Sequence, residues 1–419
     1  MINGEKEVLP DTTEVMIIGA GPTGLALAIA LHQAGIDHVL VERLAMGLHT
    51  SRAGVVHAQT LASLERLGVA GRLVELGLKL ENFAIRDRDR MLLKLGFGNL
   101  PLPYPYVLMI PQNLTEEVLA DRIAKLGGVV HRGVEAKSVT QDADGAHVTV
   151  VQDGRETTIS ARYVVGADGM HSVVRQAAGI GFDGEAYDGV FVLADVRLDW
   201  PLGATEVSLL FSPAGLVVVA PLPDGSYRIV ATVDEAPDKP AIADIQALLD
   251  ARGPSGGRAR VLDLTWSSRF RVHHRIAKSY RHERLFVMGD AAHVHSPAGG
   301  QGMNTGLIDA VVLGELLGDV INGVRPESEL NLYEGLRRPA AQEVIELAGR
   351  LTSMALTRAP LLRVLRNVAL GLVNRIPAIK RGITLKLSGL SRAKMATLPA
   401  PSQPGVRKQC NKNEFKIVA

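Results

Sequence analysis

Cysteine is almost absent from this chain. Cys410, close to the C-terminus, is the single cysteine among 419 residues. An intrachain disulfide needs two cysteines and a Cys-based metal site needs several, so neither can be the basis of the fold. The scarcity is typical of a protein that works in a reducing compartment. A chain of 44.8 kDa can instead bury a large apolar core.

Long apolar runs are also missing. Residues 1–14 contain acids, a lysine and a proline where a signal peptide would have its apolar segment. The longest uncharged run, Val207–Pro223, is interrupted by serine, proline and glycine, and it predicts two strands. No run has the length that a membrane-spanning helix requires. We therefore expect a cytoplasmic protein.

Aromatic residues make up 4% of the chain, and this scarcity argues against nucleic-acid binding. The net charge of +2 is unevenly distributed, because residues 350–419 contain 14 lysines and arginines and one acid. Within this basic region apolar residues recur at helical spacing, with arginines on other faces. The simpler interpretation is a helix packed on the cofactor domain. The alternative is an amphipathic helix peripheral to the inner face of a membrane. The apolar residues are Leu361, Leu365, Val368 and Leu372, and the arginines are Arg358, Arg363 and Arg366.

The order of predicted elements indicates an α/β protein whose first domain is discontinuous. A strand at Val15–Ile18, a helix at Leu25–Ala34 and a strand at Val39–Val41 form a βαβ unit. Short apolar runs between about Phe182 and Phe270 predict a mainly antiparallel sheet. Leu285–Met288 then returns to a buried strand. We predict a Rossmann-type domain in 12–78, 101–181 and 280–345, an inserted β domain in 79–100 and 182–279, C-terminal helices in 346–396, and a flexible tail in 397–419.

The first turn of this βαβ unit contains a dinucleotide fingerprint, Gly19-x-Gly21-x-x-Gly24. The first glycine permits a tight turn, the second lets a pyrophosphate approach the backbone, and the third lets the helix pack on the strand. The helix N-terminus offers free amides to the phosphates. Glu42 follows the second strand, where its carboxylate can accept hydrogen bonds from a ribose. The alternative is a tight turn without a ligand. We assign Gly19, Gly21, Pro22, Thr23, Gly24, Glu42 and Arg43 to the dinucleotide.

A second glycine-rich segment follows the strand Leu285–Met288. It begins with Gly289-Asp290 and continues, after two histidines, from Pro297 to Asn304. A carboxylate at a strand end can bind a sugar hydroxyl, and glycines let the backbone pass close to a flat, bulky ligand. The sequence has no second fingerprint with its own strand, helix and acid. A second dinucleotide would therefore have no Rossmann domain of its own.

Three motifs in this order resemble the single-component flavoprotein aromatic hydroxylases, the family of para-hydroxybenzoate hydroxylase. They are the fingerprint at 19–24, the segment Gly166-Ala167-Asp168-Gly169 with Ser172 and Arg175, and Gly289-Asp290 with 297–304. The resemblance covers about residues 12–345. It implies a non-covalently bound FAD. Larger relatives continue into a thioredoxin-like domain, which we do not expect here.

The resemblance assigns further residues to the cofactor. It implies that Arg52 lies near the flavin, that Gln112 contacts it, and that Asp168 and Arg175 serve both FAD and NAD(P)H. It places the loop that starts at Pro297 beside the isoalloxazine ring. The helix after this loop keeps Asp309 of a family motif but lacks that motif's asparagine and tryptophan. The residues assigned in this way are Arg52, Gln112, Asp168, Arg175, Gly289, Asp290, Pro297, Gly300, Gln301, Gly302, Met303 and Asn304.

The implied activity is that of a monooxygenase. NAD(P)H, a transient co-substrate, would reduce FAD, O₂ would give a flavin hydroperoxide, and an aromatic small molecule, phenolic or quinone-like, would be hydroxylated. The cofactor would carry out the redox chemistry. The protein would orient the cofactor and the substrate and would provide a pocket that excludes water. Two alternatives stay open: a flavoprotein reductase of the same superfamily that acts on lipid double bonds, and a non-catalytic flavin-binding protein. The choice between NADH and NADPH also stays open.

No side chain can be assigned as a catalytic acid or base. Pro297 and His295 are candidates for a place near the flavin or the substrate. The histidine pairs at 273–274 and at 293 and 295 have no supporting cluster of carboxylates or cysteines, so we expect no metal. Side chains of the inserted sheet could line a substrate pocket, although alternating strand positions more often belong to the core. These are Tyr187, Phe191, Phe211, Tyr227 and Arg228.

Overall fold

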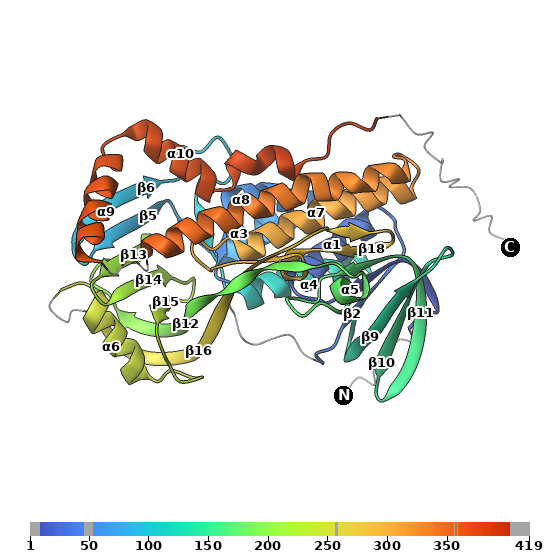
Figure 1. Cartoon of the computed structure of the whole chain (residues 1–419), viewed down its shortest axis with the longest axis horizontal. Coiled ribbons are helices and arrows are strands. Elements are labelled where there is room, and N and C mark those ends of the chain that lie inside the picture. The colour runs from blue at the N-terminus through green and yellow to red at the C-terminus, as the bar shows by residue number, and fades with distance from the viewer. Residues whose placement is uncertain (1–8, 46–52, 256–258, 356, 358, 403–419) are drawn as a thin grey trace, which may run out of the picture.

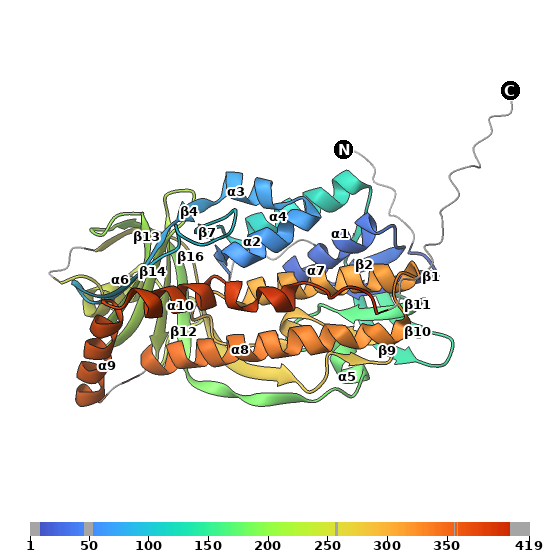
Figure 2. The ribbon, with the colours of Figure 1, turned by 90° about the horizontal axis from the view of Figure 1, so that it is seen from above.

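The computed structural model describes residues 9–45, 53–255, 259–355, 357 and 359–402. Two large sheets form most of the α/β fold, and two long strands, β12 (Phe182–Asp199) and β16 (Arg260–Ala277), run from the second sheet toward the first (Figure 1). The long helices α7 (Gly302–Ile321) and α8 (Leu332–Ala355) extend along the molecule beside both sheets (Figures 1 and 2).

The first sheet contains the predicted βαβ unit. β1 (Thr12–Ile18) pairs in parallel with β2 (His38–Glu42) and with β11 (Arg155–Gly166), and β11 pairs in parallel with β18 (Leu285–Val287). Because these strands are parallel, their carboxyl ends meet at one edge of the sheet. The other strands of this sheet are β8 (Val130–Arg132), β9 (Val134–Gln141), β10 (Ala146–Gln152) and β17 (Arg281–His282).

Helix α1 (Pro22–Gln33) lies at the centre of the first domain. It contacts both α4 (Gln112–Leu126) and α7. Its side chains from Leu25 to Leu31 are all buried, because the sheet and the helices surround it, and this explains its almost uniformly apolar sequence. Smaller elements nearby are β3 (Val55–Val56), α2 (Ala58–Leu64), η1 (Glu65–Leu67), α3 (Ala70–Leu76), β4 (Leu78–Leu80), β7 (Val107–Met109) and α5 (Val173–Ala177).

The second sheet is mainly antiparallel, as predicted, and its strand order is β19-β16-β12-β15-β14-β13-β5-β6. Among the described residues of this sheet, the one parallel pair joins β13 to β5. The two strands predicted within Val207–Pro223 are β13 and β14, so that prediction is confirmed. The domain boundaries stay predictions. The remaining bounds are β5 (Asn82–Asp87), β6 (Arg90–Gly96), β13 (Glu206–Ser212), β14 (Gly215–Pro221), β15 (Tyr227–Val233), α6 (Ile242–Arg252), η2 (Gly289–Ala291) and β19 (His293–Val294).

The C-terminal region corrects one prediction. Helix α9 (Pro360–Val373) contacts β6 of the second sheet, and its spaced apolar residues are exposed instead of packed on the cofactor domain. Residues 397–402, the start of the predicted tail, contact η3 (Glu327–Asn331) and the residues before it: the amide of Ser402 donates to Glu329 at 2.9 Å, and Arg325 donates to the carbonyl of Pro399 at 2.6 Å. Residues 403–419 lie outside the described residues. The last elements are α10 (Pro377–Leu387) and η4 (Leu390–Ala396). Among the described residues, no helix is long and apolar enough to cross a membrane.

Candidate functional site

The three glycine motifs meet at the carboxyl edge of the first sheet. Gly19 has φ +102°, and a Cβ built on it would lie 2.4 Å from the carbonyl oxygen of Ala167, so the first motif touches the second. A Cβ on Gly289 would lie 2.9 Å from Oγ1 of Thr23, and a Cβ on Gly306 would lie 2.5 Å from the same atom. The third motif therefore packs against the first. Only glycine allows these approaches without displacement of a neighbour.

The fingerprint leaves room for a pyrophosphate. A Cβ built on Gly21 would meet no atom within 4 Å, in contrast to the crowded Gly19. Gly21 is the N-cap of α1, it makes no side-chain cap, and Pro22 follows at the first helical position. The amides of the first turn have no partner within the helix, and the positive end of the helix dipole lies there. These residues fit a dinucleotide such as FAD.

Glu42 connects the fingerprint turn to β2. Its Oε2 accepts the amide hydrogen of Ala20 at 2.9 Å, and its Oε1 accepts that of Leu44 at 3.0 Å. A carboxylate offers about four acceptor positions, so both oxygens can still accept a hydroxyl. Arg43, next in the chain, is exposed. The predicted contact of Glu42 with a ribose is therefore compatible with its geometry.

The second motif is held by its own side chains. Oδ2 of Asp168 accepts the amide hydrogen of Val173 at 2.7 Å. Burial raises the pKa of Asp168, and hydrogen bonds from Ser172 and nearby amides partly offset this rise. The guanidinium of Arg175 is buried and donates to the carbonyl oxygens of Ala291 and Met170. Arg175 thus ties this motif to the third one, and its direct contact with a cofactor stays a prediction.

The loop 297–304 is fixed by the side chains of its last residues. Asn304 accepts the amide hydrogen of His57 at 2.8 Å and donates to the carbonyl oxygens of Val55 and Gly300. Gln301, which is 2% exposed, donates to the carbonyl of Leu387 at 2.9 Å. Because these amide groups are engaged by the protein, we expect this loop to meet a cofactor mainly through its backbone.

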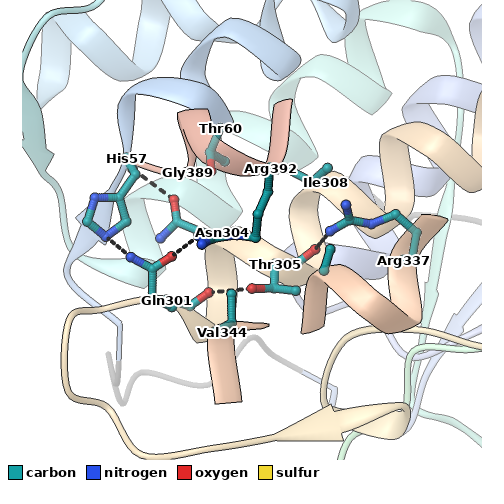
Figure 3. Close-up of a pocket in the computed structure, with 11 residues that line it drawn as sticks. His57, Thr60, Gln301, Asn304, Thr305, Ile308, Arg337, Val344, Gly389 and Arg392 are labelled. Carbon is teal, nitrogen blue, oxygen red and sulfur yellow. Dashed lines mark hydrogen bonds between the residues drawn. The ribbon is translucent and has the colours of Figure 1, made fainter. Parts of the chain in front are cut away.

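A small polar cavity lies behind the loop (Figure 3). It measures about 20 Å³, enough for one water molecule. Nε2 of His57 donates to the carbonyl oxygen of Gly299 at 2.8 Å, and Arg392 donates to Oε1 of Gln301 at 3.2 Å. Burial lowers the pKa of His57 to about 4, so this imidazole is neutral at pH 7. The site of Figure 3 connects α2, the loop and η4.

A buried ionic centre on α7 binds the residues that precede the loop. Asp309 is fully buried; its Oδ2 accepts from His293 at 2.7 Å and from the amide of Gly289 at 3.2 Å. Its Oδ1 accepts from Nε of Arg337 at 2.8 Å. Burial alone would raise the pKa of Asp309, but His293 and Arg337 hold it below its ordinary value. Sequence reasoning noticed Asp309 and missed both partners.

The structure describes all but one of the remaining residues that we assigned to the cofactor. Asp290 is exposed in η2, directly after β18. Oε1 of Gln112 accepts the amide hydrogen of Ala53 at 3.2 Å, next to Arg52, which lies outside the described residues. Pro297, Gly300, Gly302 and Met303 lie on or directly after the loop, at intermediate exposure.

His293 and His295, the two histidines near the loop, have different hydrogen-bond partners. His295 follows β19, its Nδ1 lies 2.8 Å from the carbonyl of Ser296, and burial lowers its pKa to about 4. His293 is committed to Asp309. Among the described residues, no group of three or more histidines, cysteines or acids could hold a metal.

Most of the pocket candidates from the inserted sheet belong to the core. Phe191 and Phe211 are buried, and Phe191 stacks on Phe270 at 5.8 Å. Arg228 forms a two-point ion pair with Asp195 and donates to the carbonyl of Ala53 at 2.7 Å. It therefore connects the second sheet to the cofactor domain. Tyr227 is half-buried, and the side chain of Tyr187 lies outside the described residues.

The chain matches the family described as "FAD binding domain" over residues 12–348. The chain belongs to this family. It is 35% identical to 6-methylpretetramide 4-monooxygenase of Streptomyces rimosus, over 91% of this chain and 69% of that one. It is 33% identical to pentachlorophenol 4-monooxygenase of Sphingobium chlorophenolicum, over 79% and 63%. Its structure resembles that of p-nitrophenol 4-monooxygenase from Pseudomonas putida DLL-E4, with a TM-score of 0.83, 25% identity, and coverage of 92% and 99%.

Membership of this FAD-dependent aromatic monooxygenase family confirms the predicted resemblance, the fold class and FAD as the cofactor. The two relatives quoted above are longer proteins: the chain spans 69% and 63% of their lengths. The individual residues assigned to FAD stay predictions that the geometry at the sheet edge supports.

Proposed function

We propose that this protein is an FAD-dependent monooxygenase that uses NAD(P)H and O₂ to hydroxylate a phenolic or quinone-like aromatic molecule. The meeting of the three glycine motifs around the open space at Gly21 supports FAD binding. Two relatives, named as monooxygenases of 6-methylpretetramide and of pentachlorophenol, support the substrate class.

The overall reaction balances without a metal. An aromatic C–H bond and O₂, with NAD(P)H and a proton, give an aromatic C–OH bond, NAD(P)⁺ and water. FAD, when bound, accepts the hydride and delivers the electrons to O₂. The protein's task is to bind, orient and exclude water. The first-turn amides of α1 and the carboxylates of Glu42 and Asp290 would hold FAD, while the 297–304 backbone would lie along its ring.

The substrate would lie between the second sheet and the 297–304 loop. Two connections support this position. β16 pairs with β19, which leads directly into the loop. Arg228 of β15 reaches the backbone of Ala53, next to the segment of Arg52. A substrate held there would touch both the sheet and the flavin. NAD(P)H has no fingerprint of its own, so we propose that it visits the same region transiently.

The deciding experiment is a screen of phenols, quinones and polycyclic aromatics with the FAD-loaded protein. We expect at least one compound to accelerate NAD(P)H oxidation and to gain one oxygen atom by mass spectrometry, with label from ¹⁸O₂. A product formed equally well without O₂ would favour the flavoprotein reductase. FAD binding with no NAD(P)H consumption for any compound would favour a non-catalytic flavoprotein.

A further inference from the structure

Helix α9 presents its apolar side to solvent. Six large apolar side chains of this 14-residue helix are between 51% and 71% exposed, and Leu370 is the buried one. Isolated exposed apolar residues are ordinary on proteins, but a contiguous row of them marks an interaction surface. These residues are Leu361, Leu362, Val364, Leu365, Val368 and Leu372.

The side of α9 that faces the protein combines Leu370 and Val373, which pack on the core of the second sheet, with polar side chains, so most of the large apolar residues of the helix face away from the protein. Arg366 lies half-buried, with its guanidinium 3.8 Å from the ring centre of Phe211, and it donates to the carbonyl of Met354 at 2.9 Å. Nδ2 of Asn367 donates to Asp87 at 2.7 Å. These contacts fix the rotation of the helix. The outward direction of the apolar side is therefore set by specific bonds.

The apolar residues cover a broad arc. Leu361, Leu365, Val368 and Leu372 follow helical spacing, and Leu362 and Val364 widen the row on its two sides. Ile376 and Ile379 continue it beyond the helix at 44% and 43% exposure. We call these eight residues the α9 patch. An arc this broad suits a helix that lies in an interface better than the narrow seam of a coiled coil.

The elements around the α9 patch are basic. β6, α9 and α10 contact one another and together contain seven lysines and arginines and no acid. Arg90, Lys94, Arg381 and Lys386 are exposed among them, and Arg375 between α9 and α10 is exposed as well. Figures 1 and 2 show α9 on the outside, at the end of the molecule that holds the second sheet.

We propose that the α9 patch docks this protein on the surface of an anionic lipid bilayer. Apolar side chains would enter the boundary between head groups and acyl chains, and the basic rim would contact the head groups. A second copy of the chain fits less well, because two mainly basic rims would face each other, and the nearby acids Asp87 and Asp89 are already engaged by Asn367 and Ser255. This inference does not rest on the proposed function, since docking needs no turnover.

The test uses the full chain loaded with FAD. Co-sedimentation is measured with vesicles of phosphatidylcholine alone and with vesicles that also contain phosphatidylglycerol. We expect binding to the anionic vesicles and release at high salt, because screening weakens the attraction of exposed charges. Leu365→Glu should weaken this binding about tenfold or more. Leu262→Glu is the matched control, because Leu262 is 54% exposed against 55% for Leu365 and lies on β16.

The outcomes separate the possible occupants. The proposal is supported if Leu365→Glu abolishes binding to the anionic vesicles and Leu262→Glu leaves that binding unchanged. Equal partition into neutral and anionic vesicles, or none into either, overturns it. Analytical ultracentrifugation runs alongside. A dimer that Leu365→Glu dissociates, together with no vesicle binding, would assign the patch to a second copy. The flavin absorbance of each variant shows that the fold is intact, independently of catalysis.

Discussion

Nε2 of His293 lies 2.7 Å from Oδ2 of Asp309, and both side chains are shielded from solvent. The same carboxylate accepts the amide hydrogen of Gly289, and Arg337 binds its other oxygen. One buried charge on α7 therefore holds three elements together: β19 before the 297–304 loop, Gly289 at the start of the third motif, and α8. Among the assigned cofactor residues, Gly289 is the one that Asp309 binds directly.

Replacement of Asp309 by asparagine should destabilise the protein by about 3–5 kcal/mol, because it leaves the guanidinium of Arg337 buried without a counter-charge. Urea unfolding at neutral pH measures this loss. Glu315→Gln is the control on the same helix, since Glu315 forms an exposed pair with Arg66 and should change stability by less than about 1 kcal/mol. Equal stabilities for the two variants would contradict the role given to Asp309.

The fingerprint could be predicted because all its information is local. Strand, glycines, helix and acid follow one another within about thirty residues, and the structure assembles them as expected. The partners of Asp309 could not be predicted from the sequence, because Arg337 lies 28 positions away on another helix. Contacts such as Gln301 with His57, 244 positions apart, likewise depend on the tertiary fold.

Helix α9 shows a different limit of sequence reasoning. Its periodicity correctly identified one apolar face and one polar face. Periodicity says nothing about which face turns toward the protein, and burial is simply the commoner outcome. Here the bonds of Arg366 and Asn367, together with the burial of Leu370, leave the larger apolar face turned outward. Neither bond has a signature in the spacing of residues.

Gly21→Val should abolish FAD binding and leave the fold intact. The valine side chain would occupy the space at the helix N-terminus that we assign to the pyrophosphate, where a Cβ meets no protein atom within 4 Å. Gly19→Val is the comparison, because φ +102° and the carbonyl of Ala167 exclude a side chain there. It should therefore lower the melting temperature as well. Bound flavin is read from its visible absorbance. Full flavin occupancy in Gly21→Val would rule out this position for the pyrophosphate.

Glu42→Ala and Asp290→Ala should each weaken FAD binding by roughly ten- to a hundredfold. Each removes a charged acceptor for a sugar hydroxyl, and such hydrogen bonds contribute about 1.5–3 kcal/mol. Isothermal titration of the apoprotein with FAD gives the dissociation constants. Glu156→Ala, an exposed acid on β11, controls for a general loss of negative charge. Unchanged affinity in both site variants would refute these two assignments.

Stability should fall as the pH drops from about 7 to about 5. The folded-state pKa of His57 is about 4, below the unfolded value of 6.5, so the unfolded chain binds a proton first. The stability that neutral His57 provides is present above the unfolded pKa and is lost as the pH falls toward the folded pKa. This histidine alone should cost about 2 kcal/mol over that interval.

His295, with its pKa also lowered to about 4, acts in the same direction. His57→Gln should flatten the pH dependence of urea midpoints, whereas His171→Gln, at an exposed position, should leave its slope unchanged. Identical slopes for wild type and His57→Gln would mean that the buried imidazole does not control acid stability.

Substrate should accelerate NAD(P)H oxidation by at least about tenfold, or 1.4 kcal/mol of coupling. NAD(P)H has no fingerprint of its own, so we propose that it visits a site shared with the flavin and the substrate, and that the flavin changes position between its reduction and its reaction with O₂. A substrate shifts such an equilibrium only through different affinities for the two states. The 297–304 loop, which we predict to lie beside the flavin ring, has a backbone suited to such movement, since Gly299 and Gly300 have φ +84° and +62°. Proline fixes φ near −65°, so Gly299→Pro should reduce the stimulation more than it reduces FAD binding.

Gly323→Pro is the control, because Gly323 has φ +73° at the far end of α7, about 30 Å along the helix. It should lower stability and keep the stimulation. Stopped-flow reduction rates that are equal with and without a verified substrate would defeat the gating and leave the monooxygenase proposal standing.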